Sequence, residues 1–346
     1  MHPLLSAQAE AALELLPREV FDYFDGGAGD EISRAEAETA WQRWRFAPRA
    51  LVDVSTVRTD VELLGAALCN PFLVAPMASH ALAHPDGEVA TVRGANAAGA
   101  LPIVSTRASR TLEEIGASAG PWWFQVYVTQ ERAVTAGLIE RAAAAGATAL
   151  VLTGDTPYLG RKKRQGRLEP LTSEAALVNL GRHVPAGADP AAAIEQSRSV
   201  TESEIGWLAR VSGLPVLVKG ILRPDDARRA VDAGAQGIVV SNHGGRQLDR
   251  AVASAAALRS VVGAVEVPVL VDGGIRSGAD ALVALALGAR AVLVGRPILW
   301  ALAAGGAESV AAALAALRDD LEECMGLAGA INLDAVKEDL LVDAGS

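Results

Sequence analysis

Cysteine and aromatic residues are scarce in this chain of 346 residues. It has two cysteines, and aromatic residues make up 4% of the sequence. Cys69 and Cys324 lie far apart and form none of the short spacings that hold a metal ion or a redox-active disulfide. We therefore expect buried or inert thiols and no metal site.

Excess positive charge and long apolar runs are also missing. The 31 Lys and Arg against 41 Asp and Glu give a net charge of −10, which argues against nucleic acid as a main partner. Residues 1–16 lack the basic start and apolar block of a secretory signal. The nearest approach to a membrane span, at 301–316, is interrupted by Gly305, Gly306 and Glu308. We expect a cytoplasmic protein that binds neither nucleic acid nor membrane.

A repeating pattern begins near residue 70. Helix-like segments that end around an Ala-Gly pair are followed by short apolar runs, as at Gly146 before 149–153 and at Gly234 before 237–241. Glycine just past a helix supplies the left-handed cap. Apolar strands without alternation are buried on both faces, which is typical of parallel strands covered by helices.

Eight such runs are strand candidates, at 72–78, 101–106, 122–128, 149–156, 215–220, 237–242, 268–274 and 291–296. Eight strand–helix units over residues 70–326 predict an α/β fold of the (β/α)8 TIM barrel type. The alternative, an open doubly wound sheet, would place a glycine-rich dinucleotide loop at the first helix, and the sequence has none there.

Two regions depart from the repeat, and the whole chain is predicted to be one domain, 1–346. Residues 1–69 are expected to form an N-terminal cap, helical to about Trp44 and extended after it. Residues 157–200 form a long insertion after the fourth strand, of a length typical of active-site lids or mobile loops.

The most informative stretch is 241–249, directly after the apolar run 237–240. His243 can take a proton near neutral pH, and Arg246 can hold a carboxylate through two parallel hydrogen bonds. The two glycines between them let the backbone approach a ligand closely. This combination suits chemistry at the carbon next to a carboxylate, at the strand ends where barrels place their active sites.

The last two strands end in glycine- and arginine-containing turns, 272–276 and 295–297. Loops in these places often form a phosphate site, and backbone amides with two arginines suit a phosphate dianion. Lys219 ends the fifth strand, where it would either form a Schiff base, as in an aldolase, or offer a cation to an electron-rich ring.

The chain resembles the FMN-dependent 2-hydroxy acid oxidase and dehydrogenase family, whose members include glycolate oxidase, lactate oxidase, mandelate dehydrogenase and hydroxymandelate oxidase. Among these members, it resembles the bacterial hydroxymandelate oxidases most. The likeness is carried by residues 21–28, 75–78, 84–88, 124–127, 153–157, 217–220, 241–249, 272–276 and 295–297. Of these, the block 241–249 is the most specific.

The resemblance implies oxidation of an (S)-2-hydroxy acid, aryl mandelate-like acids included, to the 2-oxo acid. Hydride would pass to flavin N5, and oxygen or another acceptor would reoxidise the flavin. His243 is implied as the base, with Asp155 orienting it and stabilising its protonated form. Arg246 and Tyr23 are implied to bind the substrate carboxylate, with Tyr127 near the hydroxyl.

The same resemblance implies a set of FMN contacts, in which Lys219 faces flavin N1 and O2 and the two late turns hold the ribityl chain and phosphate. The implied residues are Pro76, Met77, Ala78, Ser105, Gln125, Thr153, Lys219, Ser241, Asp272, Gly273, Gly274, Arg276, Gly295 and Arg296. A homo-oligomer, by analogy a tetramer, is also implied.

Two positions depart from the family pattern. Where its members usually carry a second substrate arginine, this chain has Lys162, and a lysine does not fully replace a bidentate clamp. Arg161 and Arg164 are the alternatives. Arg107 stands where glycolate oxidases have a tryptophan, and it either supplies the missing charge or widens the pocket toward a larger or more anionic substrate.

Two other functions stay open beside the leading one. The altered loop and Arg107 fit a flavoenzyme that tailors a bulkier metabolite or a peptide. A non-catalytic barrel scaffold is the third reading, and the intact set of His243, Arg246, Lys219 and Asp155 argues against it.

Overall fold

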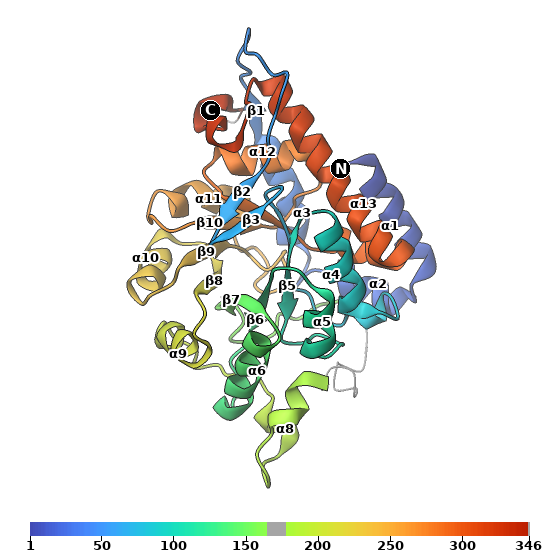
Figure 1. Ribbon diagram of the computed structural model, residues 1–346, viewed down its shortest axis with the longest axis vertical. Coiled ribbons are helices and arrows are strands. Elements are labelled where there is room, and N and C mark those ends of the chain that lie inside the picture. The colour runs from blue at the N-terminus through green and yellow to red at the C-terminus, as the bar shows by residue number, and fades with distance from the viewer. Residues whose placement is uncertain (165–177, 345–346) are drawn as a thin grey trace.

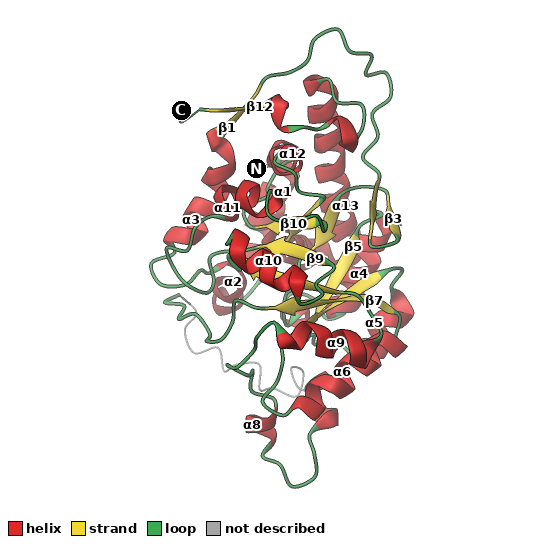
Figure 2. Ribbon diagram, turned by 90° about the vertical axis from the view of Figure 1, so that its left-hand side faces the viewer, coloured by secondary structure: helices red, strands yellow, loops and turns green. Residues whose placement is uncertain are grey.

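The computed structural model describes residues 1–164 and 178–344 and contains a closed barrel of parallel strands, β10-β11-β4-β5-β6-β7-β8-β9 (Figures 1 and 2). The strands are β4 (Phe72–Val74), β5 (Leu101–Ser105), β6 (Trp122–Val126), β7 (Ala147–Thr153), β8 (Val216–Ile221), β9 (Gly237–Val240), β10 (Val269–Asp272) and β11 (Ala291–Val294). Each overlaps one of the eight apolar runs, so the TIM-barrel prediction is confirmed.

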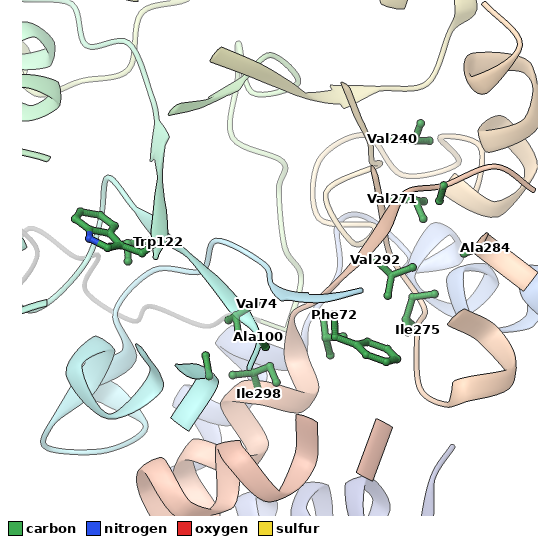
Figure 3. Packing of buried hydrophobic residues seen from close by; sticks show 14 of the residues in the cluster. Phe72, Val74, Ala100, Trp122, Val240, Val271, Ile275, Ala284, Val292 and Ile298 are labelled. Carbon is green, nitrogen blue, oxygen red and sulfur yellow. The ribbon is translucent and has the colours of Figure 1, made fainter. Parts of the chain in front are cut away.

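Both faces of these strands are buried, which explains why the runs show no alternation of apolar and polar residues. Leu73 and Leu293 belong to the cluster inside the barrel. Their neighbours Phe72, Val74 and Val292 belong to the larger cluster between the strands and the helices (Figure 3). Alternate residues thus pack on opposite sides of one closed sheet.

The barrel helices are α4 (Gly87–Ala97), α5 (Leu112–Ser118), α6 (Arg132–Ala144), α9 (Ser203–Ser212), α10 (Pro224–Asp232), α11 (Ser254–Val262), α12 (Gly278–Ala286) and α13 (Arg296–Ala328). Gly234 and Gly288 follow α10 and α12 with φ of 103° and 100°. This left-handed conformation ends each helix and turns the chain into the next strand, as the sequence predicted.

The N-terminal cap consists of α1 (Pro3–Leu15), α2 (Arg18–Asp25), α3 (Ile32–Thr39) and η1 (Ala40–Arg43), followed by β1 (Trp44–Phe46) and the hairpin β2 (Val61–Leu63) and β3 (Ala66–Leu68). Helix α1 lies beside α13 (Figure 1). Val61, Leu63 and Leu68 of the hairpin join the cluster inside the barrel. The predicted change from helix to extended chain near Trp44 is confirmed.

The remaining short elements are η2 (His80–Leu82), η3 (Gly181–His183), α8 (Pro190–Ala193), η4 (Leu333–Ala335), η5 (Glu338–Leu340) and β12 (Leu341–Asp343), which pairs with β1. Of the predicted insertion 157–200, residues 165–177 lie outside the described residues, so its lid role stays a prediction. The insertion is anchored on the barrel at Asn179, which is buried and donates to the carbonyl of Arg110 at 2.8 Å.

Helix α13 is long and apolar enough to cross a membrane by length and composition. It is bent, however, because Gly305 and Gly306 have non-helical backbone angles. It packs on α1, α4 and α12, and half of its most apolar window is buried. The glycines that interrupt the apolar run in the sequence thus mark a bend in α13, a helix that packs on the outside of the barrel.

We expect Leu282→Ala to lower the free energy of unfolding by about 2–5 kcal/mol, because Leu282 of α12 is fully buried and its truncation leaves a cavity. Urea unfolding followed by circular dichroism measures the change. Leu13→Ala is the control, since Leu13 of α1 is 46% exposed and should change stability by no more than about 0.5 kcal/mol. Equal losses in the two variants would contradict this packing.

Candidate active site

A cavity of about 340 Å³ lies at the carboxyl ends of the barrel strands, and the cap contributes to its wall. The predicted site residues that line it are Tyr23, Pro76, Met77, Ala78, Ser105, Arg107, Tyr127, Lys162, Lys219, His243, Arg246, Asp272, Gly273, Gly274, Arg276, Gly295 and Arg296. The other four, Gln125, Thr153, Asp155 and Ser241, are hydrogen-bonded to one another or to residues of this lining. The structure therefore brings the whole predicted set to one place.

His243 and Asp155 form a direct pair across the ends of β9 and β7. Nδ1 of His243 lies 3.0 Å from Oδ1 and 3.2 Å from Oδ2 of Asp155. A carboxylate in this position accepts a hydrogen bond from Nδ1–H of the imidazole, which leaves Nε2 as the ring nitrogen that can take a proton. Burial opposes ionisation of Asp155, but His243 and the more distant Lys219 outweigh it and hold the pKa of this carboxyl below its usual value.

The backbone around this pair is special. His243 has a φ of 59°, which is uncommon for a residue with a side chain, and its amide donates to Oγ of Ser241 at 3.0 Å. Gly220 passes so close to Asp155 that a Cβ there would lie 2.6 Å from its side chain. Local conformation and the missing side chain at Gly220 together set the position of the pair.

Arg246 is half-buried beside Tyr23 of the cap. Its Nη1 donates to the carbonyl of Gly26 at 2.6 Å, and its Cζ lies 5.6 Å from the centre of the Tyr23 ring. Burial lowers the pKa of this guanidinium. Among residues 1–164 and 178–344 no carboxylate lies within 4.0 Å of it, so its other donors are open to an acid in the cavity.

Among the described residues, Lys162 and Arg107 are two more cationic side chains that line the cavity with Arg246. Lys162 donates to the carbonyl of Gly160 at 3.2 Å, and burial, together with the nearby charge of Arg246, lowers its pKa to about 8. Arg107 places its Cζ 5.9 Å from the centre of the Tyr127 ring. Arg161 does not line the cavity.

Arg164 is held elsewhere, by carboxylates of the cap. It forms ion pairs with Glu31 at 2.8 Å, Asp25 at 2.9 Å and Asp22 at 3.2 Å. Of the cations that the sequence left open at this loop, Lys162 is therefore the one that faces the cavity. Arg164 instead connects the loop after β7 to the cap.

A chain of neutral hydrogen bonds begins at Ser105 in the cavity wall and continues into the barrel. Nε2 of Gln125 donates to Oγ1 of Thr153 at 2.9 Å, and Ser105 donates to Oε1 of Gln125 at 3.1 Å. These contacts fix the orientation of the Gln125 amide. Such neutral polar groups suit the polar edge of a flat heterocycle, the role that the family resemblance implies for them.

Lys219 is buried and paired with Asp272. Its Nζ lies 2.9 Å from Oδ2 of Asp272 and donates to Oγ of Ser241 at 2.8 Å. Burial opposes the charge, but Asp272 and Asp155 outweigh it and raise the pKa of the ammonium. A Schiff base needs a neutral amine, so the aldolase reading of Lys219 is disfavoured.

The two late-barrel arginines form a strongly cationic corner. Arg276 pairs with Glu38 of the cap at 3.0 Å, while its buried Nε has no hydrogen-bond partner in the described part of the chain. Arg296 bonds backbone oxygens, among them that of Gly244 at 2.9 Å. Burial, with Arg246 and Arg276 nearby, lowers the pKa of Arg296 to about 9.

A guanidinium stays protonated in proteins, so this corner favours an anion that supplies the missing negative charge. Gly273 and Gly274 turn beside it with φ of 94° and 80°, and a Cβ on Gly274 would lie 1.9 Å from the carbonyl of Ala37. Free donors, buried positive charge and bare backbone fit the phosphate of FMN.

Gln247 is a site residue that the sequence analysis did not single out. Its Nε2 donates to the carbonyls of Tyr158 at 2.8 Å and Asp155 at 3.1 Å, and its Oε1 accepts from the amide of Gly160 at 3.1 Å. It therefore braces the loop after β7. Its place inside the block 241–249 was the available signal.

We expect Arg164→Met to loosen the contact between this loop and the cap. The amide of Gly29 donates to the carbonyl of Arg161 at 2.9 Å, and it should exchange hydrogen about tenfold faster, as expected for roughly 1.4 kcal/mol of lost charged hydrogen bonding. Lys163→Met is the control, because Lys163 pairs with Asp30 in an exposed position. An equal acceleration in both variants would contradict the role given to Arg164.

The comparisons with known proteins agree with this geometry. Residues 12–343 match the model of the FMN-dependent dehydrogenase family. An L-lactate oxidase of Nostoc sp. is 44% identical over 343 residues, covering 94% of each chain. A 4-hydroxymandelate oxidase of Amycolatopsis orientalis is 44% identical over 339 residues, again covering 94% of each. A solved structure of mandelate oxidase with (S)-4-hydroxymandelic acid has a TM-score of 0.89 and 41% identity, and the match covers 98% of both chains. The chain belongs to the FMN-dependent dehydrogenase family.

Proposed function

We propose that this protein oxidises an (S)-2-hydroxy acid to the 2-oxo acid with FMN as cofactor, and that oxygen or another acceptor then reoxidises the flavin. The observation that carries the proposal is the His243–Asp155 pair, at 3.0 Å, with His243 lining the same cavity as the half-buried Arg246. A base beside an acid-binding guanidinium is what removal of hydrogen from a 2-hydroxy acid requires. The names of the relatives, which are lactate, glycolate and hydroxymandelate oxidases, support the same class of substrate.

The chain's own residues would hold FMN from three sides. Arg296, Arg276 and the Gly273–Gly274 turn would bind the phosphate, and Gln125 with its hydrogen-bonded neighbours would meet the polar edge of the ring. Lys219 would supply a positive charge at that ring. FMN, when bound, supplies the acceptor for the hydride that leaves the carbon bearing the hydroxyl.

His243 would take the proton of the substrate hydroxyl at Nε2. The C–H bond is lost as a hydride and the O–H bond as a proton, so the C–O bond becomes the carbonyl of the 2-oxo acid. Asp155, held ionised, would stabilise the imidazolium that forms and keep Nδ1 protonated throughout.

The carboxylate of the substrate would bind Arg246 and Tyr23, with Lys162 as a second cation and the phenol of Tyr127 near the hydroxyl. Burial raises the pKa of both phenols, so each stays a neutral hydrogen-bond donor. These contacts would fix the acid with its hydroxyl toward His243.

A cytoplasmic location and a homotetramer, expected from the sequence, stay proposals, and sedimentation of the purified holoenzyme measures the second. The electron acceptor of the reduced flavin is identified by comparing the rate of flavin reoxidation in air with the rate in the presence of an artificial acceptor. Tailoring of a bulkier metabolite is favoured if the flavin binds but no small hydroxy acid reduces it.

We expect the purified protein to be yellow and to bleach anaerobically when an (S)-2-hydroxy acid is added. His243→Ala should slow the bleaching by about 10²- to 10⁴-fold, and Asp155→Asn should also slow it, because each loses proton transfer or its stabilisation. Stopped-flow absorbance of the flavin measures the rates, and bound flavin per chain is the control. Unchanged rates in both variants, or no bleaching by any member of a panel of 2-hydroxy acids that includes monoacids, diacids and mandelate, would contradict the proposal.

We expect the kcat/KM of the wild-type enzyme to fall as the pH rises through about 8, where Lys162 loses its proton and one positive charge leaves the carboxylate site. Lys162→Arg stays charged, so its alkaline limb should move to higher pH. Initial rates between pH 6 and 10 with one substrate test this. The same alkaline limb in both enzymes would assign it to another group.

A further inference from the structure

We propose that the preferred substrate is a 2-hydroxy acid with a second carboxylate on its side chain, and that Arg107 binds this second carboxylate. The inference rests on the proposed function and names the substrate class of that same site. It starts from the cations around the cavity and from the strands that carry them.

The cavity wall carries more positive charge than the FMN phosphate and one substrate carboxylate would neutralise. Lys219 is paired with Asp272, and Arg276 is paired with Glu38. Arg296, at the phosphate corner, and Arg246, at the carboxylate site, are taken by the two anions already proposed. Lys162 and Arg107 remain, and in the described part of the chain neither lies within 4.0 Å of a carboxylate. A cation in the wall of a largely enclosed cavity is stabilised by an anion.

Lys162 and Arg107 are not equivalent in position. Lys162 lines the same cavity as Arg246, whose charge acts on it, and both are assigned above to the first carboxylate. Arg107 follows β5, whereas Arg246 follows β9, and in the barrel order β10-β11-β4-β5-β6-β7-β8-β9 these strands lie four places apart. Four places in a ring of eight is the opposite wall. The two residues therefore enter the cavity wall from opposite strands of the barrel, and the charges of both act on the phenols of Tyr23 and Tyr127.

The backbone of Arg107 is fixed, whereas its guanidinium has no hydrogen-bond or ion-pair partner within residues 1–164 and 178–344. Its amide donates to Oγ of Ser105 at 3.1 Å, and its carbonyl accepts from the amide of Ser79 at 3.2 Å. The side chain is half-buried against Tyr127, and its charge acts on the phenols of both Tyr127 and Tyr23. Arg107 thus stands beside the phenols proposed to bind the hydroxyl and the first carboxylate, with a bidentate fork free for a second one.

An aryl side chain is the competing occupant, because a guanidinium also attracts an aromatic ring. That attraction is weaker than a bidentate ion pair in a partly desolvated site. The two occupants differ in their response to removal of the charge, so a test can separate them.

The test uses the FMN-loaded enzyme and hydroxy acids of matched length. These are (S)-2-hydroxyglutarate against (S)-2-hydroxypentanoate and (S)-malate against (S)-2-hydroxybutanoate, with (S)-mandelate as the aryl member. We expect kcat/KM to favour the diacid of each pair. In Arg107→Met that diacid-to-monoacid ratio should fall by roughly 10- to 100-fold, the effect of one charged hydrogen-bonding group. Arg107→Lys should keep part of the preference.

Arg110→Met is the matched control. Arg110 follows three residues later, donates to the carbonyl of Pro85 and does not line the cavity, so its removal should leave the ratio as in the wild type. A binding measurement without turnover accompanies the kinetics. Glutarate should perturb the flavin absorbance at lower concentration than pentanoate, and this difference should shrink in Arg107→Met.

The outcomes separate this inference from the proposed function. Bleaching by monoacids without a preference for diacids, or a loss in Arg107→Met that is as large for mandelate as for the diacids, overturns the second-carboxylate inference alone. No bleaching by any of these acids overturns the proposed function itself.

Discussion

The site depends on positive charge buried without enough protein carboxylates to balance it. Arg246 and Arg296 are half-buried and bond mainly backbone oxygens, and Arg276 is buried and keeps one side-chain nitrogen without a partner among the described residues. Burying such groups costs free energy unless anions accompany them. Bound anions, namely the phosphate of FMN and an organic acid, would offset this cost by supplying the remaining negative charge. Stability and ligand binding are therefore linked, and the protein with FMN should be more stable than the protein without it.

Two other pairs of charged groups in the site differ from these arginines, since their charges are balanced within the protein. Asp155 is matched to His243, and Lys219 is matched to Asp272. The left-handed backbone at His243 and the bare backbone of Gly220 hold the first pair in place. Uncommon backbone conformations persist where the surrounding structure determines them, and they cluster at active sites. Ligand-binding groups are thus left open, while proton-handling groups are satisfied and fixed.

Most of the barrel was predictable because its signal is local. Each strand is a continuous apolar run, since both of its faces are buried, and polar residues at the strand ends stood out because barrel chemistry gathers there. Tyr23 of the cap and most of the FMN contacts were implied only by the family resemblance. The sequence could not decide which cation after β7 enters the cavity. That choice depends on Arg164 meeting Asp22, Asp25 and Glu31, about 140 residues earlier, and such pairing has no local pattern. The bracing by Gln247 and the pairing of Arg276 with Glu38 were missed for the same reason.

The packing of α1 on α13 has a consequence for synthesis on the ribosome. The first helix is made at the start of translation, but the apolar surface that receives it, in residues 296–328, emerges nearly three hundred residues later. Contacts between such distant segments form late. During most of elongation α1 is thus an amphipathic segment without its native neighbour, and a nascent chain that stalls before α13 would expose it to chaperones and proteases.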